Sequence, residues 1–119
     1  PLITFHGILS ADSKKTELLF LEVSGHFKAD KQGLSVPCAA MSALIRTYGR
    51  QIESCKGLTV KIKADKAGSF RAEIESIDPD EKGWYAGICD FLLCGLGDLV
   101  RDYPHEFVME LKRRRKHGS

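Results

Sequence analysis

Apolar and polar residues alternate in several short segments of the chain, which is the pattern of half-buried β-strands. Residues 2–8 and 18–23 show it on either side of a polar turn, so together they predict a hairpin. Residues 58–63 and 70–76 alternate more regularly around the turn ADKAG and predict a second hairpin. The short run 106–111 predicts a last strand.

Two other segments have the helical period. After Pro37, apolar residues recur at alternating steps of three and four, which predicts one stripe of an amphipathic helix: Cys38, Met41, Ile45, Tyr48, Ile52 and Cys55. Pro37 suits the first helical position because its missing N–H would have no partner there. Residues 84–100 predict a second helix. Its apolar surface is wider than one sheet face covers, so we expect part of it to contact another subunit.

The order strand, strand, helix, strand, strand, helix, strand predicts an α+β fold. In this fold a small antiparallel or mixed sheet carries both helices on one face. A length of 119 residues is that of one domain. We expect residues 1–111 to form this domain and residues 112–119 to form a basic C-terminal tail.

Charge is distributed unevenly along the chain. The segment KRRRK carries five positive charges, and removing them from the net charge of +2 leaves about −3 for the rest. An acidic body argues against nucleic-acid binding by the whole domain. The tail still allows a contact with RNA or the ribosome through Lys112, Arg113, Arg114, Arg115 and Lys116. A non-catalytic ribosome- or RNA-associated binding module is therefore the alternative function.

The apolar runs look too short and interrupted to span a bilayer, and no signal region is evident, so we expect a cytoplasmic protein with reduced thiols. The four cysteines form no C-x-x-C pair, and we expect neither a metal nor a cofactor. Cys55, Cys89 and Cys94 lie in apolar helical surroundings, and we interpret them as core or interface residues. The common nucleotide-binding, zincin and α/β-hydrolase motifs do not occur.

Cys38 and His26 are the candidates for chemistry. A cysteine at a helix N-terminus has its thiolate favoured by the helix dipole, and the free N–H groups there can stabilise an oxyanion. His26 follows the second predicted strand and could return across the loop to act as a base. Each also has a structural interpretation, because Cys38 continues the apolar stripe and His26 suits an exposed turn. The local sequence leaves both interpretations open.

The pair Gly25-His26, a short polar loop, and the segment CAAMSAL opening a helix together resemble the ribosomal-processing cysteine protease family, Prp. The spacing between histidine and cysteine is the family spacing, and the order of elements is similar along nearly the whole chain. The two motifs at this separation are more specific than either alone. The matching positions are Gly25, His26, Gly33, Cys38, Ala39, Ser42, Ala43 and Leu44.

The resemblance implies a cysteine endopeptidase with Cys38 as nucleophile and His26 as base. Family members remove an N-terminal extension from large-subunit ribosomal protein number twenty-seven during ribosome assembly. The family fold is a small homodimer. An inactive relative that binds this substrate without cutting it is a further alternative.

Four other residues receive supporting roles from the resemblance. In this family the loop between the histidine and the cysteine covers the site and moves for substrate, and the resemblance gives that mobility to Gly33 and the charged KADKQ run. Gly25 belongs to the motif as the residue directly before the histidine. Ser42, one turn after the cysteine, supports the packing or hydrogen bonding of the site. The family usually has an aspartate three residues before the cysteine. This chain has Ser35 there, which offers hydrogen bonds but no fixed negative charge.

Overall fold

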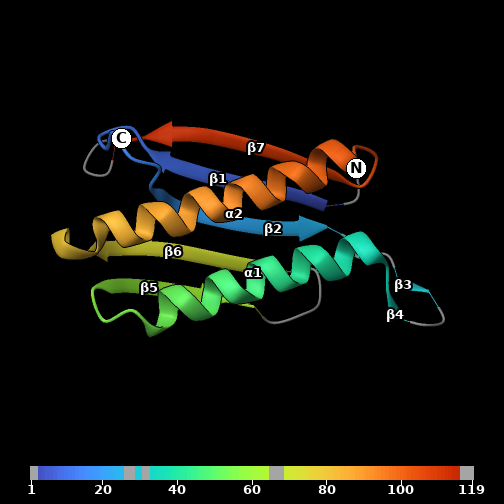
Figure 1. Ribbon diagram of the computed structural model, residues 1–119, viewed down its shortest axis with the longest axis horizontal. Helices are drawn as coiled ribbons and strands as arrows, with labels where there is room; N and C mark the ends of the chain where they lie inside the picture. The colour runs from blue at the N-terminus through green and yellow to red at the C-terminus, as the bar shows by residue number, and fades with distance from the viewer. Residues whose placement is uncertain (1–2, 26–28, 31–32, 65–68, 116–119) are drawn as a thin grey trace.

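The computed structural model describes residues 3–25, 29–30, 33–64 and 69–115. One layer is a five-stranded sheet, and two long helices cover one of its faces (Figure 1). This confirms the predicted α+β fold and its order of main elements. The elements are β1 (Ile3–Ser10), β2 (Leu18–Gly25), β3 (Ala29–Asp30), β4 (Gly33–Leu34), α1 (Val36–Ser54), β5 (Leu58–Lys63), β6 (Phe70–Ile77), the 3₁₀ turn η1 (Pro79–Glu81), α2 (Lys82–Asp102) and β7 (Phe107–Arg114).

The sheet has the strand order β5-β6-β2-β1-β7. Both predicted hairpins are confirmed, since β1 pairs antiparallel with β2 and β5 pairs antiparallel with β6. The hairpins join through an antiparallel β2–β6 pair, while β7 runs parallel to β1. The sheet is therefore mixed, and β1, the first strand of the fold, lies inside it rather than at an edge.

Several elements are longer than the sequence pattern predicts. The strand β7 continues to Arg114, so Lys112, Arg113 and Arg114 of the expected tail pair with Ile8, Leu9 and Ser10 of β1. Main-chain hydrogen bonds to β1 support this extension whatever the side chains are. The segment DPDEKG, which follows β6, contains the turn η1.

The helix α2 continues through Gly95 and Gly97 to Asp102. A Cβ at Gly95 would lie 3.0 Å from Cδ1 of Leu44, whereas nothing lies within 4 Å of one at Gly97. The glycine at position 95 therefore lets α1 and α2 approach each other closely. This packing contact offsets the low helix propensity of that glycine.

The core lies between the helices and the sheet. The predicted stripe of α1 is buried, except that Cys55 is only half-buried where the helix ends. In β5 the alternation is also confirmed, because Thr59 and Lys61 are exposed between the more buried Leu58, Val60 and Ile62. The largest side chains with under 2% exposure are Tyr85, Phe5, Phe107, Ile3, Leu18, Leu21, Met41, Ile52, Leu92 and Leu96.

A hydrogen-bonded cluster lies inside this core. The Tyr85 hydroxyl donates to the carbonyl oxygen of Leu18 over 2.7 Å, and the Tyr48 and Tyr85 hydroxyl oxygens are 2.8 Å apart. A tyrosine has one hydroxyl hydrogen, so Tyr48 is the donor to Tyr85. The N–H of Leu18 donates to the Cys89 sulfur over 3.5 Å. These bonds connect both helices with β2 and satisfy polar groups that water does not reach.

The segment Pro79–Asp102 is long and apolar enough, by length and composition, to cross a membrane. The expectation that no apolar run reaches this length is therefore wrong for this segment. In the structure this helix packs one side against the sheet, with Tyr85, Cys89, Leu92 and Leu96 almost completely buried. We interpret it as the core helix of the fold.

Candidate active site

Ser35 caps the N-terminus of α1. Its backbone is extended, with φ −62° and ψ 158°, and its hydroxyl oxygen accepts a hydrogen bond from the N–H of Cys38 over 3.3 Å. The Ser35 carbonyl accepts from the N–H of Ala39 over 2.8 Å. The Ser35 side chain thus satisfies one backbone donor that a helix start would otherwise leave open, and its carbonyl accepts the first main-chain hydrogen bond of the helix.

The helix begins at Val36, so the expectation that Pro37 is the first helical residue is wrong by one position. The reason is that Ser35 is the capping residue, and the helical conformation begins directly after it. Pro37 is still in the first turn, where a missing N–H is tolerated. Cys38 is consequently the third helical residue instead of the second.

Cys38 packs into the hydrophobic core with only 1% of its surface exposed. Its position therefore combines the two interpretations that the sequence left open: it lies in the first turn of a helix and continues the buried stripe. A peptide bond cannot contact the sulfur in this arrangement unless neighbouring atoms move.

His26 lies outside the described residues, and its pairing with Cys38 stays a prediction. Its neighbour Gly25 is described and ends β2 with a φ of 136°. That value is one that side-chain-bearing residues rarely adopt. The glycine therefore lets the chain leave the sheet in a direction that other residues disfavour, directly before the candidate base.

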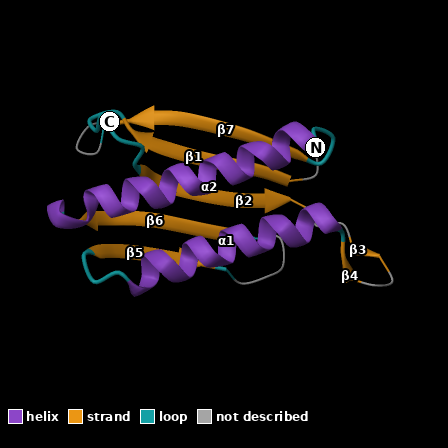
Figure 2. Cartoon of the chain, viewed as in Figure 1, coloured by secondary structure: helices purple, strands orange, loops and turns teal. Residues whose placement is uncertain are grey.

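The segment between β2 and α1 contains a small hairpin. Ala29 pairs with Leu34, and Asp30 pairs with Gly33, as β3 and β4. This corrects the expectation of an irregular loop for these residues. Figure 2 shows the hairpin next to the N-terminal end of α1, away from the main sheet. Gly33 is therefore placed near the start of the helix that carries the cysteine.

Ser42 follows Cys38 by about one helical turn and is half-buried. Its hydroxyl has no hydrogen-bond partner among the described residues. The supporting role that the resemblance gives to Ser42 stays a prediction.

The four cysteines are free thiols: Cys38 and Cys89 are buried, Cys55 is half-buried and Cys94 is exposed. Cys94 is therefore not a core residue. No cluster of three metal-ligating side chains occurs within the described part of the chain. Burial raises the pKa of the Cys89 thiol to about 11, so this second buried cysteine is neutral at physiological pH.

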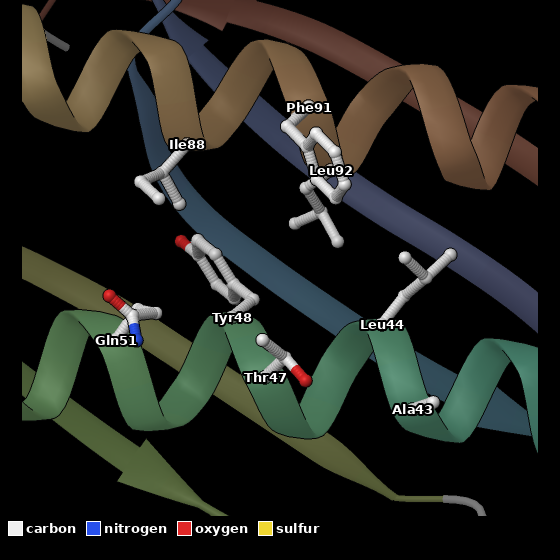
Figure 3. A pocket seen from close by; sticks show the side chains of 8 residues that line it. All are labelled: Ala43, Leu44, Thr47, Tyr48, Gln51, Ile88, Phe91 and Leu92. Carbon is white, nitrogen blue, oxygen red and sulfur yellow. The ribbon is translucent and has the colours of Figure 1, made fainter.

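An apolar groove lies between α1 and α2. Its volume is about 210 Å³. Figure 3 shows side chains from both helices extending into it, including the ring of Phe91, which is 74% exposed. The sequence predicted a wide apolar surface on α2 but not a groove shared with α1. The lining residues are Ala43, Leu44, Thr47, Tyr48, Gln51, Ile88, Phe91 and Leu92.

Solved structures show the same fold. SMU.848 from Streptococcus mutans has a TM-score of 0.73 and 18% identity, covering 96% of this chain and 100% of its own. The essential ribosomal processing protease Prp from S. aureus, with a covalently linked product peptide, has a TM-score of 0.74 and 19% identity, covering 93% and 100%. Its complex with a substrate peptide has a TM-score of 0.72 and 18% identity, with the same coverage.

The chain thus has the fold of the solved ribosomal processing proteases. A comparison with curated proteins finds no match. The family model described as cysteine protease Prp matches residues 9–108, which is most of the chain. The chain belongs to the cysteine protease Prp family.

Proposed function

We propose that this chain is a cysteine endopeptidase in which Cys38 is the nucleophile and His26 the general base. Its proposed substrate is the precursor of large-subunit ribosomal protein number twenty-seven, from which it removes an N-terminal extension during ribosome assembly in the cytoplasm. The observation that carries the proposal is the family match across residues 9–108, a range that includes both residues.

The position of Cys38 supports this role. As the third residue of a 19-residue helix, it lies where the helix dipole favours a negative charge. The S. aureus Prp in complex with a covalently linked product peptide supports a mechanism with a covalent step. The Cys38 sulfur is the atom that would make this bond here.

In the proposed reaction, His26 takes the thiol proton and the Cys38 sulfur attacks the carbonyl carbon of the scissile peptide bond. The tetrahedral intermediate collapses, the C–N bond breaks, and the leaving amine takes the proton from His26. A water molecule, deprotonated by His26, then attacks the thioester carbonyl and releases the new carboxylate. The sulfur leaves as thiolate and takes the proton back from His26, which regenerates the thiol and the neutral histidine.

The oxyanion needs donors near the sulfur, and the N–H of Cys38 is one candidate. In the structure that N–H donates to the Ser35 hydroxyl over 3.3 Å, which is longer than the usual ~2.9–3.0 Å for such bonds. We infer that the substrate oxygen replaces the Ser35 hydroxyl as the acceptor. Ser35 would then hold the donor in place before substrate arrives.

We also propose a homodimer that uses the groove face of α1 and α2. One apolar surface consists of the exposed Phe91 ring, of Trp84, which is 38% exposed, and of the groove between the helices. Such a surface favours burial against another chain. A second copy is the occupant that the family resemblance supports.

The decisive experiment mixes the purified protein with the precursor of the ribosomal protein from the same genome and measures the products by mass spectrometry. We expect wild type to release the extension, and Cys38→Ala and His26→Ala to leave the precursor intact. Cys94→Ala is the matched control, because it removes an exposed thiol outside the proposed site. Cleavage by Cys38→Ala, or an extended precursor left uncut by wild type, would contradict the proposal.

Thiol labelling tests the base separately from the substrate. Because Cys94 is exposed and Cys55 is half-buried, whereas Cys38 and Cys89 are both buried, the comparison requires a Cys55→Ser/Cys94→Ser background. At neutral pH, iodoacetamide should then label Cys38 before Cys89, and His26→Ala should remove this preference. Equal labelling of the two buried thiols would favour an inactive binding module.

A further inference from the structure

We propose that the chain has a second binding surface, for the phosphodiester backbone of RNA, at the end of the molecule opposite Cys38. This surface, the basic end, consists of Lys14, Lys15, Lys112, Arg113, Arg114 and Arg115. It extends the predicted tail contact by two lysines from a distant part of the sequence. It does not depend on the proposed peptidase activity.

The parallel pairing of β1 and β7 creates the basic end. Ser10 at the end of β1 is in register with Arg114 at the end of β7, and the N–H of Ala11 donates to the Arg114 carbonyl over 2.9 Å. The turn that carries Lys14 and Lys15 leaves β1 at this point and returns to β2. The two lysines therefore project from the same end of the sheet as the last residues of β7.

The cations of the basic end are accessible to solvent, with the exposed Asp12 in the same turn as the two lysines and with Glu73 and Glu75 lining one hollow together with Arg114. All six residues are exposed, and none of their side chains makes an ion pair with a carboxylate among the described residues. Arg113 uses one N–H for the Ser10 carbonyl, over 3.4 Å. Glu17, at the end of the same turn, is buried at 4% exposure and does not present its carboxylate to a ligand there.

A helix terminus adds to the positive potential. The Nζ atom of Lys15 lies 3.6 Å from the position that a Cβ at Gly83 would occupy, so Lys15 approaches the first turn of α2. The N-terminus of a helix carries a partial positive charge. A cation held near it without a carboxylate partner favours an anionic ligand at this end.

The chemistry favours a nucleic-acid backbone over a base-specific contact. The basic end consists only of lysines and arginines, which bind phosphate, and contributes no aromatic side chain for base stacking. The rest of the chain carries a net negative charge, which limits the contact to this region. We therefore expect binding that is independent of sequence and weakens steeply with salt.

Separation from the candidate active site makes the two functions testable apart. The molecule is 46 Å long, and Figure 1 shows α1 beginning at one end of the long axis while β7 finishes at the other. RNA bound at the basic end would leave the region of Cys38 uncovered. Cys38→Ala should accordingly bind RNA as wild type does.

The test is fluorescence anisotropy with a labelled single-stranded RNA of mixed sequence, titrated at several salt concentrations. If all six cations contact phosphates, the slope of log K against log salt should be about −4 for a single strand. Lys14→Gln/Lys15→Gln and Arg114→Gln/Arg115→Gln should each lower its magnitude by about 1.4. Arg113 is kept because it bonds to Ser10.

The matched control is Arg46→Gln/Arg50→Gln, which removes two exposed charges from α1. An equal loss of affinity in this control would mean that net charge alone drives binding and would overturn the proposal. Unchanged binding by Lys14→Gln/Lys15→Gln would also overturn it, since the tail would then act alone. Tighter binding to polyglutamate than to RNA would identify an acidic protein as the partner instead.

Discussion

The hydroxyl oxygen of Ser35 accepts a hydrogen bond from the backbone N–H of Cys38. The resemblance to the family implies an aspartate at this position, and serine and aspartate are both among the best N-cap residues. Serine and aspartate here would therefore cap α1 equally well and differ in the negative charge. This relationship separates two roles of the position, helix capping and electrostatics, which substitutions can test independently.

Ser35→Ala should destabilise the protein by about 1 kcal/mol, because the N–H of Cys38 loses its acceptor at the helix start. Ser35→Asp should keep the stability, since aspartate caps equally well and its charge suits the helix dipole. Urea denaturation measures both. Ser54→Ala, which removes an exposed hydroxyl at the other end of α1, is the control and should change little. A Ser35→Ala variant as stable as wild type would show that the cap is not used.

Gly25→Ala should destabilise the protein by about 1–3 kcal/mol, because a φ of 136° is strained for any residue with a Cβ. It should also lower kcat/KM for precursor cleavage, by more than the smaller folded fraction accounts for. The reason is that a changed backbone at Gly25 would displace His26, the next residue and the proposed base. Gly97→Ala is the contrasting control: nothing lies within 4 Å of its Cβ position. There, alanine should stabilise α2 by up to about 1 kcal/mol. Equal effects at the two glycines would contradict the role given to Gly25.

Tyr85→Phe should cost more stability than Tyr48→Phe. The first substitution leaves the Leu18 carbonyl without its donor and the Tyr48 hydroxyl without its acceptor, which costs roughly 1–3 kcal/mol for each buried group. The second removes only a donor to Tyr85, whose own bond to Leu18 stays, and should cost about 1 kcal/mol. Urea denaturation of both single variants and the double variant gives the coupling energy. A larger loss of stability for Tyr48→Phe than for Tyr85→Phe would contradict the assignment of Tyr48 as the donor to Tyr85.

The fold should lose stability at alkaline pH. Burial raises the pKa of the Cys89 thiol from 9.0 to about 11 and raises the pKa of Tyr48 and Tyr85 above the usual value of 10.0. Folding favours the neutral form of each group, so their contribution is complete below about pH 9 and decreases as the pH rises through 11. For Cys89 this contribution is on the order of 3 kcal/mol.

Urea midpoints measured from pH 7 to 11 under reducing conditions test this dependence. The midpoint should decrease above pH 9 in wild type and more gently in Cys89→Ala, since one of the three titrating groups is then absent. Cys94→Ala, at an exposed position, should follow wild type. A urea midpoint that does not change up to pH 11 would show that ionisation of these buried groups does not lower the stability of the fold.

Phe91→Glu should convert the proposed dimer to monomers, because it puts a charge at the centre of the apolar helix face. Sedimentation velocity gives the molecular mass directly. Thr59→Glu introduces the same charge at an exposed position of β5, on the other face of the sheet, and should leave the dimer intact. If the Phe91→Glu protein still sediments with the mass of a dimer, the interface lies on another surface.

Periodicity predicted most of the fold because burial against the sheet determines it. The stripe from Cys38 to Ile52 is buried as a set, and both hairpins form where the alternation is interrupted by turn residues. The extension of β7 to Arg114 was missed because its cause is a main-chain ladder with β1. Three consecutive basic side chains give no strand signal, and their partner strand lies at the other end of the sequence.

The candidate site was predictable only in part. Spacing alone placed Cys38 near a helix start, but it left open whether the thiol is buried, and the structure shows that it is. Ser35 carries a clear signal, since serine directly before a helix is the usual N-cap. The small β3–β4 hairpin carries none, because two-residue strands have too few positions for alternation to be visible.

The parallel pairing of β1 with β7 also bears on biosynthesis. Until the final strand has left the ribosome, β1 has one vacant edge, and the nascent chain exposes a template for wrong strand partners. Contacts between remote segments form late and slowly. Chains truncated before residue 107 should therefore aggregate, and this polypeptide completes its folding only when translation of its last strand is over.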